Sequence, residues 1–220
     1  MFDELFDLFG KDRRDYCELI PLSTWYDFIF EDGSKFSYTG DLDHTFEQIR
    51  QFEPSDVQGY KRLLDLSESI FRVGFEQLSD QPFTRFWTML KQVPALLKLQ
   101  SYRTVYGLVS KYISNEKLRK VFSIHPLLVG GNPFTTTSIY TLIHFLERKW
   151  GIHFARGGTG ALVKSLEKLM TEEGVTIETN FDVTRIEINP QTKKVTGLSS
   201  ADGREIVCDG LVFNGDPPYA

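Results

Sequence analysis

The spacing of hydrophobic positions changes along the chain and divides it into predicted strands and helices. Apolar residues alternate over 25–30 and 35–38, and the turn-forming residues 31–34 join these two predicted strands into a hairpin. After Pro54 the spacing becomes three and four, which predicts a long amphipathic helix. One face of this helix is marked by Val57, Tyr60, Leu63, Leu64, Ser67, Phe71, Phe75 and Leu78.

Four more helices are predicted in the middle of the chain. Each has apolar residues at helical spacing, and prolines or glycines mark several of the ends. The last of the four is apolar on most sides, so we expect it to be buried. These helices span 83–93, 102–113, 118–129 and 135–150.

Helix and strand patterns are mixed after Gly151. A helix over 161–171 is followed by short apolar runs, which the turn-forming pairs Asn189-Pro190 and Asp202-Gly203 separate. This part is α/β in character, so the chain as a whole is predicted to be α+β or α/β. The predicted strands span 175–179, 183–188, 195–198, 205–208 and 211–213.

Composition places the chain among folded globular proteins. It has 220 residues, 41% hydrophobic and 25% charged, which suffices for one or two domains with a sizeable core. No apolar run approaches the ~18 residues of a membrane span, and the acidic N-terminus does not read as a signal peptide. Cys17 and Cys208 lie far apart, so we expect a reducing cytoplasm and no disulfide framework.

Charge is distributed unevenly along the chain. Residues 1–80 carry a net charge of −10, residues 81–150 carry +8 and residues 151–220 carry −3. The basic middle block is rich in aromatic residues, which is typical of a surface on an anionic bilayer, although a solvated helix face explains it equally well. Nucleic-acid binding is disfavoured, because the rest of the chain is acidic and lacks any known reader motif.

Two glycine pairs, Gly130-Gly131 and Gly157-Gly158, each adjoin a predicted helix. The second pair precedes the helix over 161–171, whose free N–H groups suit an anion, but Val163 stands where a dinucleotide fingerprint needs its third glycine. A tight turn explains the second pair, and a helix C-cap explains the first. The pairs alone leave both a shaped cavity and plain turns open.

No catalytic or metal-binding motif stands out elsewhere. The four histidines lack the spacing of metal ligands, so no metal site is predicted. His125 and His144 lie among apolar residues, which favours hydrogen-bonded core histidines over ligands or bases. The sequence shows no Ser–His–Asp order, Walker loop or paired carboxylates.

Several blocks of sequence, taken in order, resemble the bacterial-type phytoene desaturases, a family of FAD-dependent, amine-oxidase-like flavoproteins. The most specific blocks are HPLLVGGNPFTTTSIYTLIHFLERKWG and FARGGTGALV, and the others are ELFDLFGK, QFEPSDVQGYKRLL, PALLKLQSYRTVY and VFNGD. Together they cover nearly the whole chain. The strand and GxGxxG loop with which the family begins are absent, so the chain resembles an internal fragment of such an enzyme.

The resemblance implies three parts and a set of ligands. Residues 1–53 would supply substrate-domain strands and connections, residues 54–150 a helical, membrane-facing part, and residues 151–220 a partial Rossmann-like FAD domain. The implied cofactor is FAD, and the implied partners are a phytoene-like carotenoid precursor and a membrane surface that the protein contacts peripherally from the cytoplasm. The oligomeric state does not follow from it.

The resemblance also implies site residues, position by position. The acid/base Asp and Arg proposed for some members correspond to Thr88 and Lys91, which leaves Lys91 as the candidate for such chemistry. Hydride transfer to the flavin, with an apolar tunnel fixing the geometry, would suffice without it. FAD would meet Val183 near the adenine and Asn214, Gly215 and Asp216 near the nucleotide. The tunnel or its flavin end would be lined by Gly130, Gly131, Asn132, Phe134, Gly157, Gly158 and Thr159.

The function implied is that of an FAD-dependent carotenoid desaturase, which dehydrogenates a long polyene by hydride transfer to flavin. A carotenoid isomerase or a carotenoid oxidase on the same scaffold is the first alternative. A non-catalytic lipid- or membrane-binding module is the second, because the chain lacks half of the family's flavin site. The chain alone is expected to be inactive.

Overall fold

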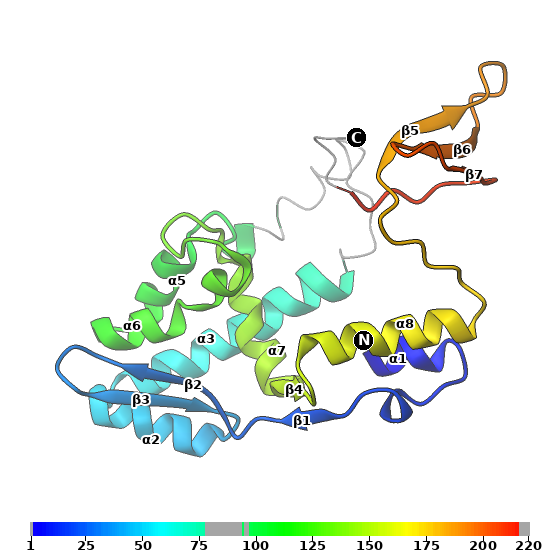
Figure 1. The fold of residues 1–220 in the computed structure, drawn as a ribbon. Helices are drawn as coiled ribbons and strands as arrows, with labels where there is room; N and C mark the ends of the chain where they lie inside the picture. Colours follow the sequence, from blue (N-terminus) through cyan, green and yellow to red (C-terminus); the bar gives the residue numbers. More distant parts are fainter. Residues whose placement is uncertain (1, 78–93, 95–96, 216–220) are drawn as a thin grey trace. The chain divides into compact units, whose positions relative to one another are not determined.

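The computed structural model describes residues 2–77, 94 and 97–215, and the chain divides into two compact units. The larger unit spans Arg13–Ala161, and the smaller one joins Met1–Asp12 to Leu162–Ala220. Both units combine helices with short antiparallel strands (Figure 1), so the mixed α and β class expected from the sequence is confirmed. None of the helices in the described ranges is long and apolar enough to cross a membrane.

The predicted hairpin is present in the larger unit. Strand β2 (Thr24–Ile29) pairs antiparallel with β3 (Lys35–Thr39), and Gly33 takes a φ of 79° in the turn, as the turn residues indicated. Helix α2 (Leu42–Phe52) follows, although the sequence reading did not include it. Its start is fixed by Asp41, whose carboxylate accepts hydrogen bonds from two backbone N–H groups of the first turn.

The long amphipathic helix is α3 (Asp56–Phe71), and it packs against α5 (Val105–Tyr112). The two helices approach so closely at Gly59 that an added Cβ would lie 1.9 Å from the Tyr112 carbonyl oxygen. The buried Asp56 carboxylate locks the same contact, because it accepts hydrogen bonds of 2.7–2.9 Å from the Ser114 N–H and hydroxyl and from the Asn115 N–H. The end of α3 continues as a π-helical turn, η2 (Arg72–Gln77).

The core of the larger unit is rich in aromatic rings. Tyr60 of α3 stacks on Phe122 at a centroid distance of 4.3 Å, and Phe36 and Tyr38 of β3 meet Phe122 edge to face. Aliphatic residues from the helices complete this core. The buried members are Phe36, Tyr38, Ile49, Val57, Tyr60, Leu63, Val105, Val109, Ile113, Leu118, Val121 and Phe122.

The single helix predicted over 118–129 is wrong, because the chain forms two shorter elements there. Helix α6 (Glu116–Phe122) is followed by a 3-10 turn, η3 (His125–Val129). Pro126 explains the interruption, since it has no N–H group to bond back into α6 and it restricts the residue before it. The turn ends at Gly130, whose φ of 75° is that of a left-handed cap, as the C-cap interpretation of this glycine required.

The helix predicted over 135–150 is also corrected. The chain forms a 3-10 turn, η4 (Ser138–Thr141), and then α7 (Leu142–Trp150). The expectation of burial holds for one face, and that face is polar. Its members recur every three residues and are Ser138, Thr141, His144 and Glu147. The apolar residues Ile139, Tyr140, Leu142, Ile143, Phe145 and Leu146 are partly exposed. The number of apolar residues was therefore a poor guide to which face is buried. The polar face is buried because its side chains find hydrogen-bond partners inside the protein.

A second strand pair in the larger unit was not predicted. Strand β1 (Leu19–Pro21) pairs antiparallel with β4 (His153–Ala155), from the far end of the unit in sequence. Both strands are three residues long, too short to produce a readable alternation. A short 3-10 turn, η1 (Arg13–Asp15), precedes β1.

The smaller unit contains a helix, a short N-terminal helix and a three-stranded sheet. Helix α8 (Thr159–Glu172), whose first turn still belongs to the larger unit, confirms the helix predicted over 161–171. Lys11, just after α1 (Phe2–Asp7), contacts the Glu172 carboxylate at 3.3 Å. The sheet has the order β5-β6-β7 and confirms three of the predicted strands: β5 (Val183–Ile188), β6 (Val195–Ser200) and β7 (Glu205–Val207).

Two other strand predictions for this unit are wrong. Residues 175–179 and 211–213 have the composition of strands but are irregular. Val175 and Ile177 are 45% and 42% exposed, and neither segment pairs with another strand in the described part of the chain. A strand needs a neighbour to satisfy its backbone, so composition alone did not make one here. The helix predicted over 83–93 and Leu78 lie outside the described residues.

Candidate functional site

The first predicted substrate-lining group forms one exposed loop after η3. Gly130 takes its left-handed conformation at the start, and Gly131 is required by space, because an added Cβ would lie 2.7 Å from the Thr136 hydroxyl oxygen. The Asn132 side-chain oxygen accepts a hydrogen bond of 2.9 Å from the Phe134 N–H. The four residues therefore share one compact turn, which we call the 130–134 loop.

The 130–134 loop is anchored on the first turn of α5. The Tyr106 N–H donates to the Pro133 carbonyl oxygen at 3.0 Å, and the Tyr106 and Phe134 rings lie 4.6 Å apart. The Val105 N–H donates to Thr136 O at 3.0 Å. These bonds occupy N–H groups that a helix start leaves without an intrahelical partner.

An apolar surface adjoins this loop. Leu127, Leu128 and Val129 are 59%, 52% and 60% exposed, and Phe134 is 62% exposed. Contiguous exposed apolar residues of this kind are typical of ligand-binding grooves and of surfaces that contact a protein or a membrane. We call these four residues the apolar loop surface.

The second predicted group forms a tight turn between β4 and α8. Gly157 and Gly158 have φ values of 85° and 80°, in the region that residues with a Cβ rarely adopt. The Gly158 N–H donates to the Ala155 carbonyl oxygen at 2.8 Å, and Thr159 begins α8. An added Cβ at Gly158 would meet nothing within 4 Å, so this glycine serves backbone conformation rather than close packing.

The two glycine turns contact different elements. The 130–134 loop lies on α5, whereas the 157–159 turn lies beside β1, where the Arg156 guanidinium pairs with the Glu18 carboxylate at 3.0 Å. The chain between the two turns consists of η4, α7 and β4.

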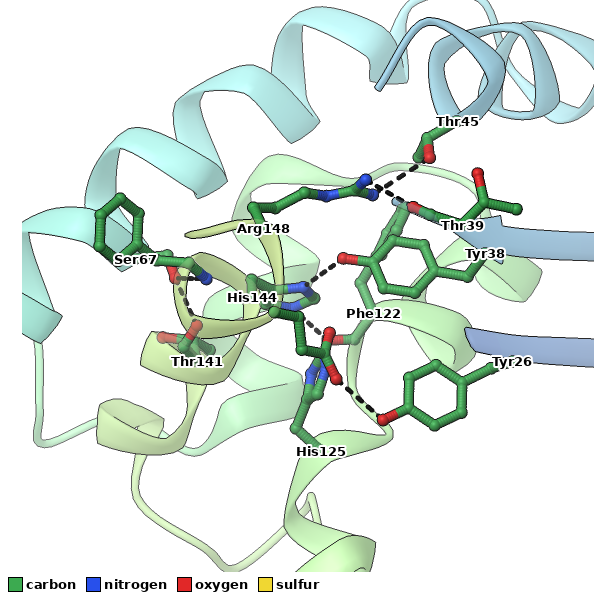
Figure 2. A network of polar contacts seen from close by, with 12 residues as sticks. Tyr26, Tyr38, Thr39, Thr45, Ser67, Phe122, His125, Thr141, His144 and Arg148 are labelled. Carbon is green, nitrogen blue, oxygen red and sulfur yellow. Dashed lines mark hydrogen bonds and ion pairs between the residues drawn. The ribbon is translucent and has the colours of Figure 1, made fainter. Parts of the chain in front are cut away.

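A buried polar network is centred on helix α7, which lies between these two turns in sequence (Figure 2). At its centre the Glu147 carboxylate of α7 accepts a hydrogen bond of 2.8 Å from the Tyr26 hydroxyl of β2. Its other oxygen lies 3.0 Å from His125 Nε2 at the start of η3. Glu147 is 6% exposed and His125 is 1% exposed, so this carboxylate joins three segments inside the protein.

A second branch of the network runs from the Phe122 carbonyl oxygen through His144 to Tyr38 and Tyr60. Because that carbonyl can only accept, it fixes the direction of each hydrogen bond in the branch. His144 Nε2 lies 3.0 Å from the Phe122 carbonyl oxygen, which can only accept, so Nε2 carries the proton. Burial and the nearby His125 lower the pKa of His144 well below its usual value, so the ring is neutral and Nδ1 is an acceptor. The Tyr38 hydroxyl therefore donates to Nδ1 at 3.4 Å and accepts from Tyr60 at 2.8 Å.

Arg148 completes this branch as a partly buried cation. Its guanidinium donates to the Thr39 carbonyl oxygen at 2.5 Å, to Thr45 Oγ1 at 3.1 Å and to the Tyr60 hydroxyl at 3.3 Å. The same group lies 4.6 Å from the centre of the Tyr38 ring. Burial raises the pKa of both Tyr38 and Tyr60, so both phenols stay neutral and act as hydrogen-bond relays.

The two histidines of the network meet face to edge. Their ring centroids lie 4.1 Å apart. Within the described residues, His125 Nδ1 is buried and has no hydrogen-bond partner. Both rings fit the core-histidine interpretation made from the sequence. No described group of three His, Cys, Asp or Glu side chains is arranged to hold a metal ion.

The predicted nucleotide contacts belong to the smaller unit. Val183 begins β5, an edge strand of the sheet, and its side chain is 47% exposed. The Ala201 N–H bonds to the Asp182 carbonyl oxygen and Val183 faces Ser200, so the N–H and C=O of Val183 point away from β6, to the side where the described residues place no strand.

The other predicted nucleotide contacts are described in part. Asn214 and Gly215 are exposed in an irregular segment. An added Cβ at Gly215 would lie 2.5 Å from the Phe213 ring. Asp216, Thr88 and Lys91 lie outside the described residues.

Sequence reasoning missed most of the buried network. It singled out His125 and His144 but not their partners Tyr26, Tyr38 and Glu147. A signal was present, because Ser138, Thr141, His144 and Glu147 recur every three residues in an otherwise apolar run. A polar stripe on an apolar helix is the pattern of an internal hydrogen-bond network.

Comparison with known proteins identifies the class. Residues 3–219 match the family model of flavin-containing amine oxidoreductases, so the chain belongs to that family, whose members are FAD-dependent oxidoreductases. Within this family the chain is similar to phytoene desaturases, as the sequence blocks indicated.

The relatives differ in what their names describe. The chain is 44% identical to the lycopene-forming phytoene desaturase of Pantoea ananas, over 97% of this chain and 43% of that protein. It is 32% identical to the neurosporene-forming enzyme of Rhodobacter capsulatus, over 97% of this chain and 41% of that protein. It is 30% identical to the 4,4'-diapolycopen-4-al dehydrogenase of Metabacillus indicus, over 94% of this chain and 42% of that protein. The chain thus spans less than half the length of these relatives.

Proposed function

We propose that this chain is part of an FAD-dependent phytoene desaturase that forms lycopene. The observation that carries the proposal is the 44% identity to a lycopene-forming enzyme across 97% of the chain. Identity to a neurosporene-forming enzyme is lower, at 32% over the same share, which favours lycopene as the product. The substrate is then a long polyene without polar groups.

The 130–134 loop and the 157–159 turn are the proposed substrate contacts. A hydrocarbon offers no hydrogen bonds, so it is recognised by apolar contact and shape. The apolar loop surface (Leu127, Leu128, Val129 and Phe134) supplies such contact beside Gly130, Gly131 and Asn132. Gly157, Gly158 and Thr159 contribute backbone without bulky side chains, which leaves room for a close approach.

The smaller unit is the proposed part of the flavin-binding domain. The backbone N–H and C=O of Val183 at the open edge of β5 would hold the adenine end of FAD, with Asn214, Gly215 and Asp216 near the nucleotide. When bound, FAD supplies the acceptor for a hydride from the substrate. The role of this chain is to hold the polyene in register and to exclude water. Lys91 remains the proposed candidate for protein acid/base chemistry.

Product analysis tests this function. The full-length protein would be expressed in a host that accumulates phytoene and lacks other desaturases, and the pigments would be separated by chromatography. Lycopene supports the proposal. A changed double-bond geometry without added conjugation would indicate an isomerase instead, and unconverted phytoene would reject a desaturase acting on it.

Carotenoid oxidation is a second candidate, because the chain is also 30% identical to a protein named 4,4'-diapolycopen-4-al dehydrogenase. The same host supplied with lycopene or its diapo analogue separates the two candidates. Products with added oxygen would favour oxidation, and unchanged pigment would reject oxidation of these substrates.

Peripheral membrane contact through the surface around 97–111 is also proposed. Leu97 and Tyr102 are 56% and 67% exposed beside the exposed Lys98 and Lys111, so apolar and basic groups share this surface. The double variant Lys98→Glu/Lys111→Glu in the full-length protein should then sediment less with anionic liposomes. Lys193→Glu/Lys194→Glu changes the charge equally in the smaller unit and serves as the control. Equal sedimentation of both variants and wild type would reject this surface, whereas liposome binding without retained flavin would favour a lipid-binding module.

A further inference from the structure

The Glu147 carboxylate contacts, from inside the protein, the turn that leads into the 130–134 loop. His125 is the first residue of η3, which runs directly into the 130–134 loop. The backbone bonds of this turn are local, since the Gly130 N–H donates to Leu127 O and the Gly131 N–H to Pro126 O. The contact of His125 Nε2 with Glu147 therefore ties a local turn to a packed helix.

The other end of the loop is tied separately. The Pro133 and Thr136 carbonyl oxygens accept from the first turn of α5. The loop is thus held on α5 at one end, while the turn that precedes it contacts the carboxylate of α7 through His125. A hydrogen bond to a carboxylate is stronger than one to a neutral acceptor, and burial strengthens it further, which suits it to fixing a position.

Glu147 makes a second contact, so its bond to the loop side of the network can be tested separately from its bond to the hairpin. Its other oxygen accepts from Tyr26, a residue of the hairpin that does not lead into the loop. The titratable and charged groups around Glu147 and His125 come from four elements: Tyr26 from β2, Tyr38 from β3, Tyr60 from α3, and His144 and Arg148 from α7. Loss of the Tyr26 contact alone weakens the same core without releasing η3.

We propose that Glu147 is a positioning residue, which acts through His125 to place the 130–134 loop against the polyene substrate. This inference rests on the proposed desaturase function, in which that loop contacts the substrate. Glu147 itself lies inside the protein and has no direct contact with the substrate. A change in Glu147 should therefore alter how well substrate is placed and not the intrinsic hydride transfer.

The test compares Glu147→Gln with Tyr26→Phe in the full-length, FAD-loaded enzyme. Glutamine keeps the shape of the side chain and offers an oxygen to His125, so the protein is expected to fold and to retain FAD. Removing the charge should raise KM for phytoene in liposomes about tenfold, with kcat within about twofold. Tyr26→Phe should leave KM within about twofold. The single variant His125→Gln keeps an N–H donor towards Glu147, so its KM should stay close to the wild-type value.

A second readout does not depend on turnover. Amide hydrogen exchange at Gly130 and Gly131 should be about tenfold faster in Glu147→Gln than in wild type, and unchanged in Tyr26→Phe. If wild type does not convert phytoene, the proposed function fails while the exchange result still reports the link from Glu147 to the loop. Equal effects of both variants, or an unchanged KM in an active Glu147→Gln enzyme, would overturn the positioning role.

Discussion

Replacing Gly59 with alanine should destabilise the larger unit, although the same change stabilises most helices. Gly59 lies inside α3, where alanine is favoured over glycine by about 1 kcal/mol. An added Cβ would stand 1.9 Å from the Tyr112 carbonyl oxygen, whereas ordinary contact begins at 3.4 Å. The neighbour is backbone and cannot rotate away, so α5 has to move from α3 by about 1.5 Å.

The size of the effect follows from what this movement disturbs. Overpacking a core costs about 1–3 kcal/mol, and Val105, Val109 and Ile113 of this region are all buried. The movement also pulls Ser114 and Asn115 away from the buried Asp56 carboxylate, at about 1–3 kcal/mol for a weakened buried acceptor. With the helical preference for alanine subtracted, the free energy of unfolding should fall by about 3 kcal/mol. Typical domains have a total of about 5–15 kcal/mol.

Urea titration followed by tryptophan fluorescence measures this loss. The matched control is Gly160→Ala, because Gly160 lies in the first turn of α8 and an added Cβ there meets nothing within 4 Å. The midpoint should fall for Gly59→Ala with an unchanged slope and should stay level or rise for Gly160→Ala. A midpoint for Gly59→Ala at or above wild type would refute the close approach of α3 and α5.

Three further changes test other parts of the molecule. Asp56→Asn should lower the unfolding free energy by about 2 kcal/mol, because the two carboxylate oxygens accept from the Ser114 and Asn115 N–H groups and an amide keeps only one acceptor oxygen. Urea titration measures this loss. The lowered pKa of His144 means that the unfolded chain binds a proton that the folded one does not, so stability should fall as pH drops below about 6.5. His144→Gln should flatten that slope in melting curves from pH 7.5 to pH 5, whereas exposed His153→Gln should not. Gly158→Val should abolish turnover of the full-length enzyme while the protein stays folded, because valine disfavours a φ of 80°; near-normal activity would make this glycine a plain turn.

Local patterns in the sequence predicted local structure well. The β2–β3 hairpin, α3, α8 and the β5–β7 meander all appear close to their predicted ranges, because each is defined by periodicity and turn residues within a few positions. The left-handed glycines at 130, 157 and 158 were likewise visible in the sequence as turn positions. The resemblance to phytoene desaturases was confirmed by the comparisons.

Features that depend on distant partners were beyond the sequence pattern. The pairing of β1 with β4 joins segments that are individually too short to recognise. The partners of Glu147 come from positions 26 and 125, and neither contact follows from the spacing within α7. Residues 175–179 show the converse case, because a strand-like pattern stays irregular where no neighbouring strand pairs with it.

The contact between Glu18 and Arg156 also limits how early the larger unit can fold during synthesis. The two residues are 138 positions apart, and they adjoin β1 and β4, which form one sheet. At about 5–20 residues per second, the ribosome needs about 7–28 s between them. Throughout that interval β1 has been made but β4 has not. The backbone N–H and C=O groups of β1 therefore lack the strand with which they pair in the folded protein. A slowly translated messenger RNA would lengthen this exposure, and the yield of folded protein should then depend on translation speed between these two points.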